Sequence, residues 1–157
     1  MSGKSSFERW SEEARLRDLP DDEADDPAPE APGIDRALVA EVRAYLADHL
    51  TQEADWRWTK AKQYPDDRRN HKAALGLANA ADQVRRLPAD DPRLVRLAEL
   101  VAEAGGRVQA ITFRDPTGRN FTAALYFWVS GGDLDGLLER IIAASERVAA
   151  ETFRAAS

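Results

Sequence analysis

The fold class depends on residues 107–129, which read RVQAITFRDPTGRNFTAALYFWV. The helical repeat of the preceding sequence gives way here to a two-residue repeat, over residues 107–114 and 119–129, that is typical of strands. The four residues between these runs, Asp-Pro-Thr-Gly at 115–118, match a type I turn with proline at its second position and glycine at its fourth. The stretch therefore predicts a two-stranded antiparallel β-hairpin.

The second predicted strand is apolar on both faces. The side chains on its two faces are Phe121, Ala123, Leu125, Phe127 and Val129 on one, and Ala124, Tyr126 and Trp128 on the other. A two-sided apolar strand is normally covered on both faces, and two strands alone make a poor sheet. Three arrangements satisfy these needs: helices on both sides, edge-to-edge pairing that makes a homodimer through the hairpin, or a strand added by a different protein.

Four helices are expected around the hairpin from apolar periodicity and from capping residues. Their start and stop signals are Asp35, Pro65, Asp66 or Asp67, Asp91-Pro92, Gly105-Gly106 and Asp133. The predicted ranges are 35–62, 67–87, 92–104 and 133–155, with the first helix either unbroken or interrupted near Thr51. The expected fold is therefore α+β, of order α-α-α-β-β-α, in a single domain at residues 34–157.

The first helix carries aromatic side chains on two faces. Six side chains share the face expected to be buried: Ile34, Leu38, Val42, Tyr45, His49 and Trp56. Trp58 falls on the opposite face of the helical wheel. An exposed Trp58 is a candidate anchor for a protein partner, because tryptophan is enriched among the residues that dominate binding energy.

The net charge of −6 is concentrated at the N-terminus. The 157 residues contain 22 Lys and Arg against 28 Asp and Glu, and residues 1–33 hold four of these bases and ten of the acids. Residues 34–157 are therefore neutral overall. Residues 18–33 are rich in Asp, Pro and Ala, a composition that buries little apolar surface, so a disordered acidic linker is expected.

A short amphipathic segment precedes this linker, at residues 6–17 of the tail 1–33. Phe7, Trp10 and Ala14 recur at helical spacing, but about a dozen residues form only a marginal helix in water. Two large aromatics on such a segment favour docking on a protein partner. The alternatives are that the segment packs on its own domain or stays disordered.

Basic and aromatic residues are interleaved at positions 55–72. The basic ones are Arg57, Lys60, Lys62, Arg68, Arg69 and Lys72. Such a mixture suits phosphate contacts combined with base stacking, so a nucleic-acid or phosphate-binding role is one interpretation. The simpler alternative is that these charges solvate a helix end, and contact with a protein or an anionic surface is a third possibility.

The sequence offers little that would support catalysis. Cysteine is absent, which excludes disulfides, thiol catalysis and sulfur-based zinc sites. The H-E-x-x-H, G-x-S-x-G and P-loop patterns are also missing. His49 is expected to be a core residue and His71 lies among cations, while Ser130-Gly131-Gly132 is better explained by helix capping than by anion binding. No catalytic residue, metal or cofactor is expected, and a small enzyme stays open only if a pocket places His49 or His71 beside a carboxylate.

These observations favour a non-enzymatic adaptor or accessory protein. It would bind a protein partner through Phe7 and Trp10 and through a helical surface that includes Trp58; the alternative is nucleic-acid or phosphate binding by residues 56–72. No apolar run approaches the roughly 20 residues that span a bilayer, and no signal peptide is apparent, so a cytoplasmic protein is expected. Arginine outnumbers lysine 18 to 4, which indicates a GC-rich bacterial source.

Overall fold

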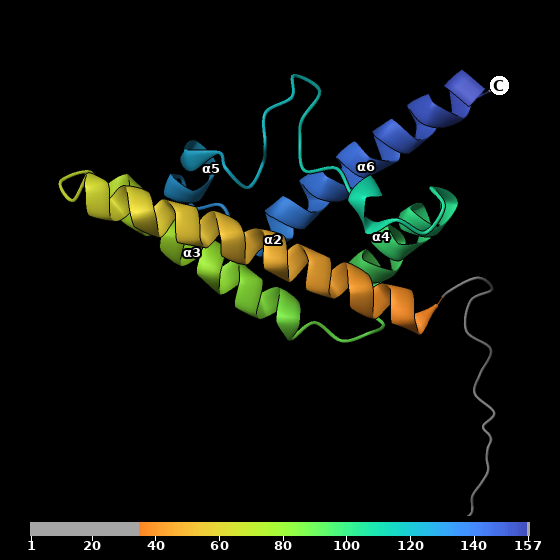
Figure 1. Ribbon diagram of the computed structural model, residues 1–157, viewed down its shortest axis with the longest axis horizontal. Coiled ribbons are helices and arrows are strands. Elements are labelled where there is room, and N and C mark those ends of the chain that lie inside the picture. The colour runs from red at the N-terminus through yellow and green to blue at the C-terminus, as the bar shows by residue number, and fades with distance from the viewer. Residues whose placement is uncertain (1–34, 157) are drawn as a thin grey trace, which may run out of the picture. The chain divides into compact units, whose positions relative to one another are not determined.

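The computed structural model describes residues 35–156, and the predicted amphipathic segment 6–17 and linker 18–33 lie outside the described residues. Five α-helices and one 3-10 helix make up this described part (Figure 1). Their bounds are α2 (Arg36–Gln63), α3 (Arg68–Arg85), α4 (Pro92–Glu103), η1 (Val108–Ala110), α5 (Leu125–Val129) and α6 (Leu134–Ala156).

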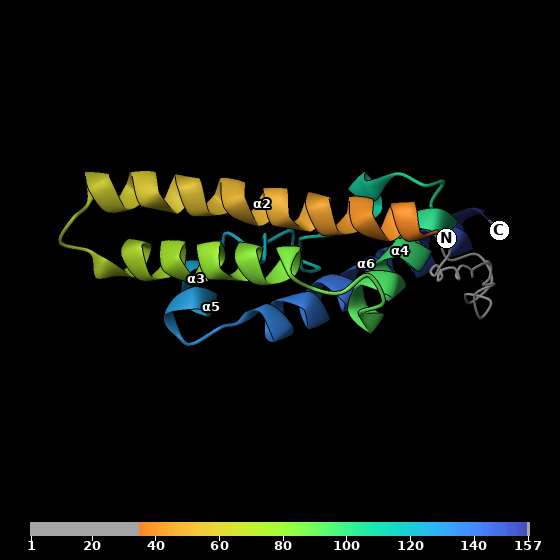
Figure 2. The same cartoon turned by 90° about the horizontal axis from the view of Figure 1, so that it is seen from below.

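Helices α2 and α3 form a long antiparallel pair (Figure 2). The predicted caps start both helices: the side chain of Asp35 accepts from the N–H of Ala37, and that of Asp67 accepts from the N–H of Arg69. Helix α2 runs unbroken through Thr51. Most of the side chains that α3 buries are small: Ala73, Ala74, Ala80 and Ala81, beside Leu77 and Val84. Small side chains let two helix backbones approach closely.

The buried face of α2 is rotated from the predicted one. The buried residues are Val39, Val42, Leu46, Ala47, Leu50, Ala54 and Arg57. Trp56, expected in the core, is 46% exposed, so that expectation is wrong. The small residues Ala47 and Ala54 lie on the buried face because packing against α3 selects side chains that fit, whereas the wheel ranked residues by apolar size.

The predicted α+β fold is wrong, because the described residues contain no strand. Of the expected hairpin only the turn and one antiparallel bridge, Arg114 with Asn120, are formed. The turn itself is as predicted, since the N–H of Gly118 donates to the Asp115 carbonyl at 2.8 Å. Residues 108–110 form η1 and residues 125–129 form α5. The hairpin edge on which the proposed homodimer depended is therefore missing from residues 35–156.

The second predicted strand coils into a helical turn that buries one of its apolar side chains, Trp128, and leaves Tyr126 exposed. The indole of Trp128 is buried against α3, where a Cβ on Gly76 would lie 2.8 Å from its Cε3 atom. Its Nε1 donates to the carbonyl of Thr122 at 3.1 Å. Asn120 opens the coil, since its side chain accepts from both the N–H and the hydroxyl of Thr122.

Two glycine pairs end helices in the same way. Gly105 and Gly106 close α4 in the left-handed conformation, and the N–H of Gly106 donates to Val101 at 2.8 Å. At α5, the N–H of Gly132 donates to Phe127 at 2.8 Å. Asp133 then caps α6 by accepting from the N–H of Gly136. Ser130-Gly131-Gly132 is thus a helix C-cap, which accounts for its glycines without an anion.

We expect Trp128→Ala to destabilise the protein by about 3–5 kcal/mol, because it empties a well-packed site on Gly76. The matched control is Tyr126→Ala on the same helix, where the side chain is 82% exposed. This control should change stability by less than about 0.5 kcal/mol. Urea denaturation followed by circular dichroism measures both, and equal effects of the two substitutions would contradict the packing described for α5.

Candidate functional site

The basic aromatic residues gather around the loop that joins α2 to α3, at one end of the folded unit (Figure 1). The structure divides them into three groups. Lys62, Arg68 and Lys72 are exposed and Lys60 is half-buried. Arg69 is ion-paired with its neighbour Asp67 at 2.7 Å. Arg57 alone is buried.

Arg57 ties three segments of the chain together. It is only 8% exposed; its Nη1 donates to Asn70 Oδ1 in α3 at 2.9 Å, and its Nη2 donates to the Ala123 carbonyl at 2.6 Å. Its Nε has no hydrogen-bond partner among the described residues. Burial lowers the pKa of Arg57, and the nearby Glu53 raises it. These contacts give Arg57 a structural role, because it holds three segments of the chain together.

Three residues form a row on the exposed side of α2, which we call the aromatic–cation row: Trp56, Lys60 and Tyr64. They are spaced four apart, so they follow one another along the helix surface. The Lys60 ammonium lies 5.6 Å from the Trp56 ring centroid and 5.8 Å from that of Tyr64. The Arg57 guanidinium lies 4.5 Å from the Trp56 ring. Trp56 is therefore exposed yet held in place from two sides.

Trp58, the predicted partner anchor, is half-buried. Its ring meets His71 edge to face, with centroids 5.1 Å apart. The exposed aromatics at this end are instead Trp56 and Tyr64, which is 57% exposed. The exposure of Trp56 could have been predicted from Ala47 and Ala54. These small residues lie on the buried side of α2, and the helical repeat then fixes the directions of residues 56 and 58.

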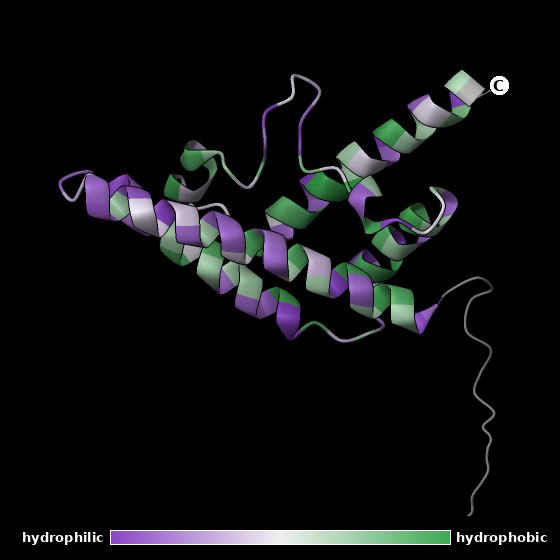
Figure 3. Cartoon of the chain, in the orientation of Figure 1, coloured by the Kyte–Doolittle hydropathy of each residue, from purple (hydrophilic) through white to green (hydrophobic). Residues whose placement is uncertain are grey.

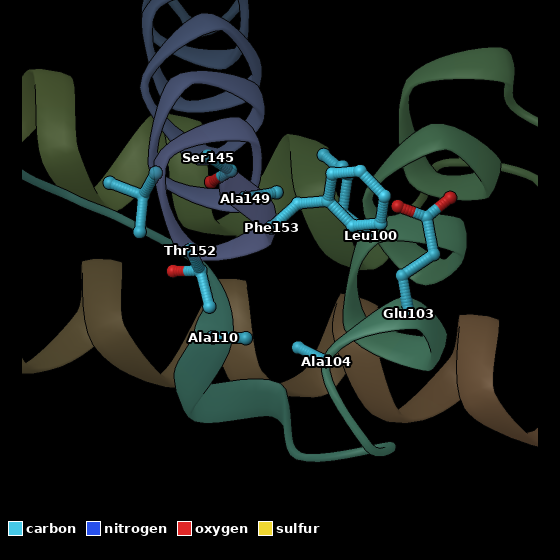
Figure 4. Close-up of a pocket in the computed structure, with 9 residues that line it drawn as sticks. Leu100, Glu103, Ala104, Ala110, Ser145, Ala149, Thr152 and Phe153 are labelled. Atoms are coloured by element: carbon cyan, nitrogen blue, oxygen red, sulfur yellow. The ribbon is translucent and has the colours of Figure 1, made fainter. Parts of the chain in front are cut away.

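A second surface lies between the C-terminal end of α4, η1 and the last turns of α6. We call it the α4–α6 groove. It has a volume of about 470 Å³ and is lined by Leu100, Glu103, Ala104, Ala110, Ser145, Val148, Ala149, Thr152 and Phe153 (Figure 4). Ser145 lies at its buried side, where its hydroxyl accepts from the N–H of Thr112 at 2.9 Å. No motif in the sequence predicted this groove.

The groove exists because α6 is longer than the helix that covers it. Helix α4 contacts α6 as far as Glu146, which pairs with Arg96 at 2.8 Å, and Leu137, Leu138 and Ile141 are buried in the first part of α6. Hydrophobic residues continue along α6 toward its last turns (Figure 3). Val148 and Ala149 are only half-buried there. The same apolar stripe that forms the core therefore becomes one wall of an open groove.

His49 fills a structural position. Its ring stacks on Phe113 at 3.8 Å, and its Nε2 lies 2.9 Å from the Thr122 hydroxyl. That hydroxyl donates to Asn120, so the imidazole Nε2 must donate to it. Burial, and to a lesser extent the Arg114 guanidinium, lower the pKa of His49. Across residues 35–156 no three His, Asp or Glu side chains are placed to hold a metal ion, and no helix is long and apolar enough to cross a membrane.

We expect Arg57→Met to cost about 2–4 kcal/mol of stability, because it leaves the buried Asn70 Oδ1 and the part-buried Ala123 carbonyl without this donor. Arg68→Met, at an exposed position of the same loop region, is the matched control and should be nearly neutral. Urea denaturation midpoints of the two variants test this. If Arg57→Met is as stable as the control, the guanidinium does not tie the segments together.

Stability should fall as the pH drops from about 7 to about 5, in part through His49. The folded state holds this imidazole neutral, so the unfolded chain binds the additional proton and acid favours unfolding. Asp67, whose pKa is lowered to about 2, stays charged across this range. We expect His49→Gln to show a smaller loss of stability than wild type between the two pH values, measured by urea titration; an undiminished loss would rule out this role.

No protein-family model, no curated protein and no solved structure matches this chain. Support for a function therefore comes from the two surfaces of the folded unit, the aromatic–cation row with its surrounding cations and the α4–α6 groove.

Proposed function

We propose that the protein is a non-enzymatic adaptor that binds a protein partner through two elements. One is the segment at residues 6–17 with Phe7 and Trp10, and the other is the helical surface at the α4–α6 groove. The groove is the observation that carries the proposal. Its walls are mostly apolar and are supplied by two helices, which is the setting in which an amphipathic helix of a partner is bound.

The groove has features that distinguish it from ordinary surface. Leu100 at its base is buried and belongs to the core of the folded unit, so the hollow stands on packed side chains. Glu103 supplies a carboxylate at its edge. A partner helix would match both features if a large apolar side chain entered the hollow and a basic residue after it paired with Glu103. Contiguous apolar surface with a polar rim is typical of interaction sites.

The N-terminal segment adds a second point of attachment. A 16-residue linker at 18–33 joins it to the folded unit, and a random coil of this length spans on the order of 20–25 Å. Two linked contacts bind more tightly than either alone, because the second binding event becomes intramolecular. In an adaptor of this kind the groove by itself can therefore have a low affinity for the partner.

The experiment is a capture from bacterial lysate in the presence of nuclease, followed by titration of the purified partner in a calorimeter. Phe7→Ala with Trp10→Ala should weaken the affinity by a few kcal/mol if both are anchors. Ala149→Arg, which places a charge inside the groove, should weaken it at least about 10-fold. The matched control is Ala143→Arg on the exposed side of α6.

Each outcome decides one part of the proposal. An unchanged affinity in the Phe7 and Trp10 double variant removes the N-terminal segment from the binding site. An affinity equal in Ala149→Arg and Ala143→Arg removes the groove. Capture that occurs only without nuclease would favour the second candidate, nucleic-acid binding by residues 56–72, which the exposed cations around Trp56 and Tyr64 support.

A further inference from the structure

We infer that the loop end of the α2–α3 pair is a separate binding surface for an acidic peptide segment that carries a large apolar side chain. The surface consists of the aromatic–cation row together with Lys62, Arg68 and Lys72. It goes beyond the proposed adaptor function, because it uses neither the α4–α6 groove nor residues 6–17. A protein with both surfaces joins two partners.

The distribution of ion pairs points to an anionic ligand. Elsewhere in the described part of the chain, four arginines form ion pairs with carboxylates: Arg85 with Asp82, Arg93 with Asp91 and Asp135, Arg96 with Glu99 and Glu146, and Arg147 with Glu151. At the loop end, no carboxylate of residues 35–156 forms an ion pair with Lys60, Lys62, Arg68 or Lys72. Four cations that form no ion pair within residues 35–156 therefore lie together at this end of the α2–α3 pair, where Asp55 and Asp66 offset only part of their charge.

The aromatic side chains supply the apolar part of the surface. Trp56 is exposed but immobilised, because Arg57, which lies against its ring, is itself fixed by Asn70 and the Ala123 carbonyl. Lys60 bridges Trp56 to Tyr64. A side chain that is already ordered loses little conformational entropy when it is covered by a ligand. Exposed, preorganised tryptophan is the residue type that dominates protein interfaces.

The arrangement favours an acidic peptide over a nucleic acid. A base that stacks on tryptophan needs an open ring face, and the Arg57 guanidinium already lies over the Trp56 ring at 4.5 Å. Exposed Asp55 and Asp66 lie among the cations and would repel a continuous line of phosphates. Peptide carboxylates can instead be spaced to meet the lysines individually, with one apolar side chain against the indole edge.

The location of the surface fits a bridging role. The loop between α2 and α3 lies at one end of the folded unit, and α4 with the last turns of α6 lies at the end where α2 begins (Figures 1 and 2). A ligand at one surface therefore leaves the other open. Since the two sites share no residue, substitutions can be chosen that affect one and not the other.

The test uses the full-length protein and three fluorescein-labelled probes in an anisotropy titration. The first probe is a peptide of Glu and Asp around a central Phe-Leu pair, the second has Lys in place of the acids, and the third is an oligo-dT strand of similar length. We expect the acidic peptide alone to bind, and to bind more weakly at about 200 mM than at about 50 mM salt. Trp56→Ala and Lys60→Ala should each weaken it at least about 10-fold.

Two control variants accompany these substitutions. Tyr126→Ala removes an exposed aromatic on α5, and Arg86→Ala removes an exposed cation at the opposite end of α3. Neither should alter the affinity, and circular dichroism should show unchanged folding in all four variants. Tyr64→Ala provides a second aromatic variant of the row, away from Arg57. Ala149→Arg in the α4–α6 groove should leave peptide binding intact, which separates this site from the adaptor groove.

Three results would overturn the inference. The acidic peptide does not bind, or it binds equally to the Trp56, Lys60 and control variants, or oligo-dT binds more tightly than the peptide. The last result would assign the surface to nucleic acid. None of these results changes the affinity of the adaptor's partner for the α4–α6 groove, which Ala149→Arg tests. The two proposals can therefore fail independently.

Discussion

The buried guanidinium of Arg57 is the contact on which the arrangement of this domain depends. It joins α2 to α3 through Asn70 and joins both helices to the 121–124 segment through the Ala123 carbonyl. Burying a guanidinium is costly unless its N–H groups find acceptors, and Nη1 and Nη2 find theirs at the point where three segments meet. The adjacent Trp56 is 46% exposed, and its ring lies 4.5 Å from the same guanidinium, so the core contact also orders the exposed row on α2.

The same contact explains why residues 121–129 do not extend as a strand. Arg57 holds the carbonyl of Ala123, and the indole of Trp128 donates to the carbonyl of Thr122. Carbonyls of adjacent strand residues point to opposite edges, so a two-stranded ladder would need one of these two acceptors, and the indole of Trp128 lies against Gly76. The surface formed by α3 therefore selects a helical turn for a sequence whose alternation is equally suited to a strand.

The two candidate surfaces have different structural causes, one in the length of a helix and the other in the distribution of charge. The α4–α6 groove follows from length, because the apolar stripe of α6 continues beyond the end of α4. The loop end of α2 and α3 follows from charge, because Lys60, Lys62, Arg68 and Lys72 lie there without forming an ion pair within residues 35–156. One surface is suited to apolar recognition and the other to recognition assisted by charge, which is consistent with partners of different chemistry.

Local signals in the sequence determined where the helices begin and end. Asp35, Asp67 and Asp91 cap the helices they were expected to cap, and Gly105 with Gly106 ends α4, because capping depends on backbone groups within a few residues. The type I turn at 115–118 was predicted for the same reason. The tertiary structure alone decided which face of α2 is buried, whether residues 119–129 extend or coil, and where the groove opens. These depend on the shape of neighbouring helices, on Gly76 beneath Trp128 and on alanines that admit close packing, and no pattern within one segment contains that information.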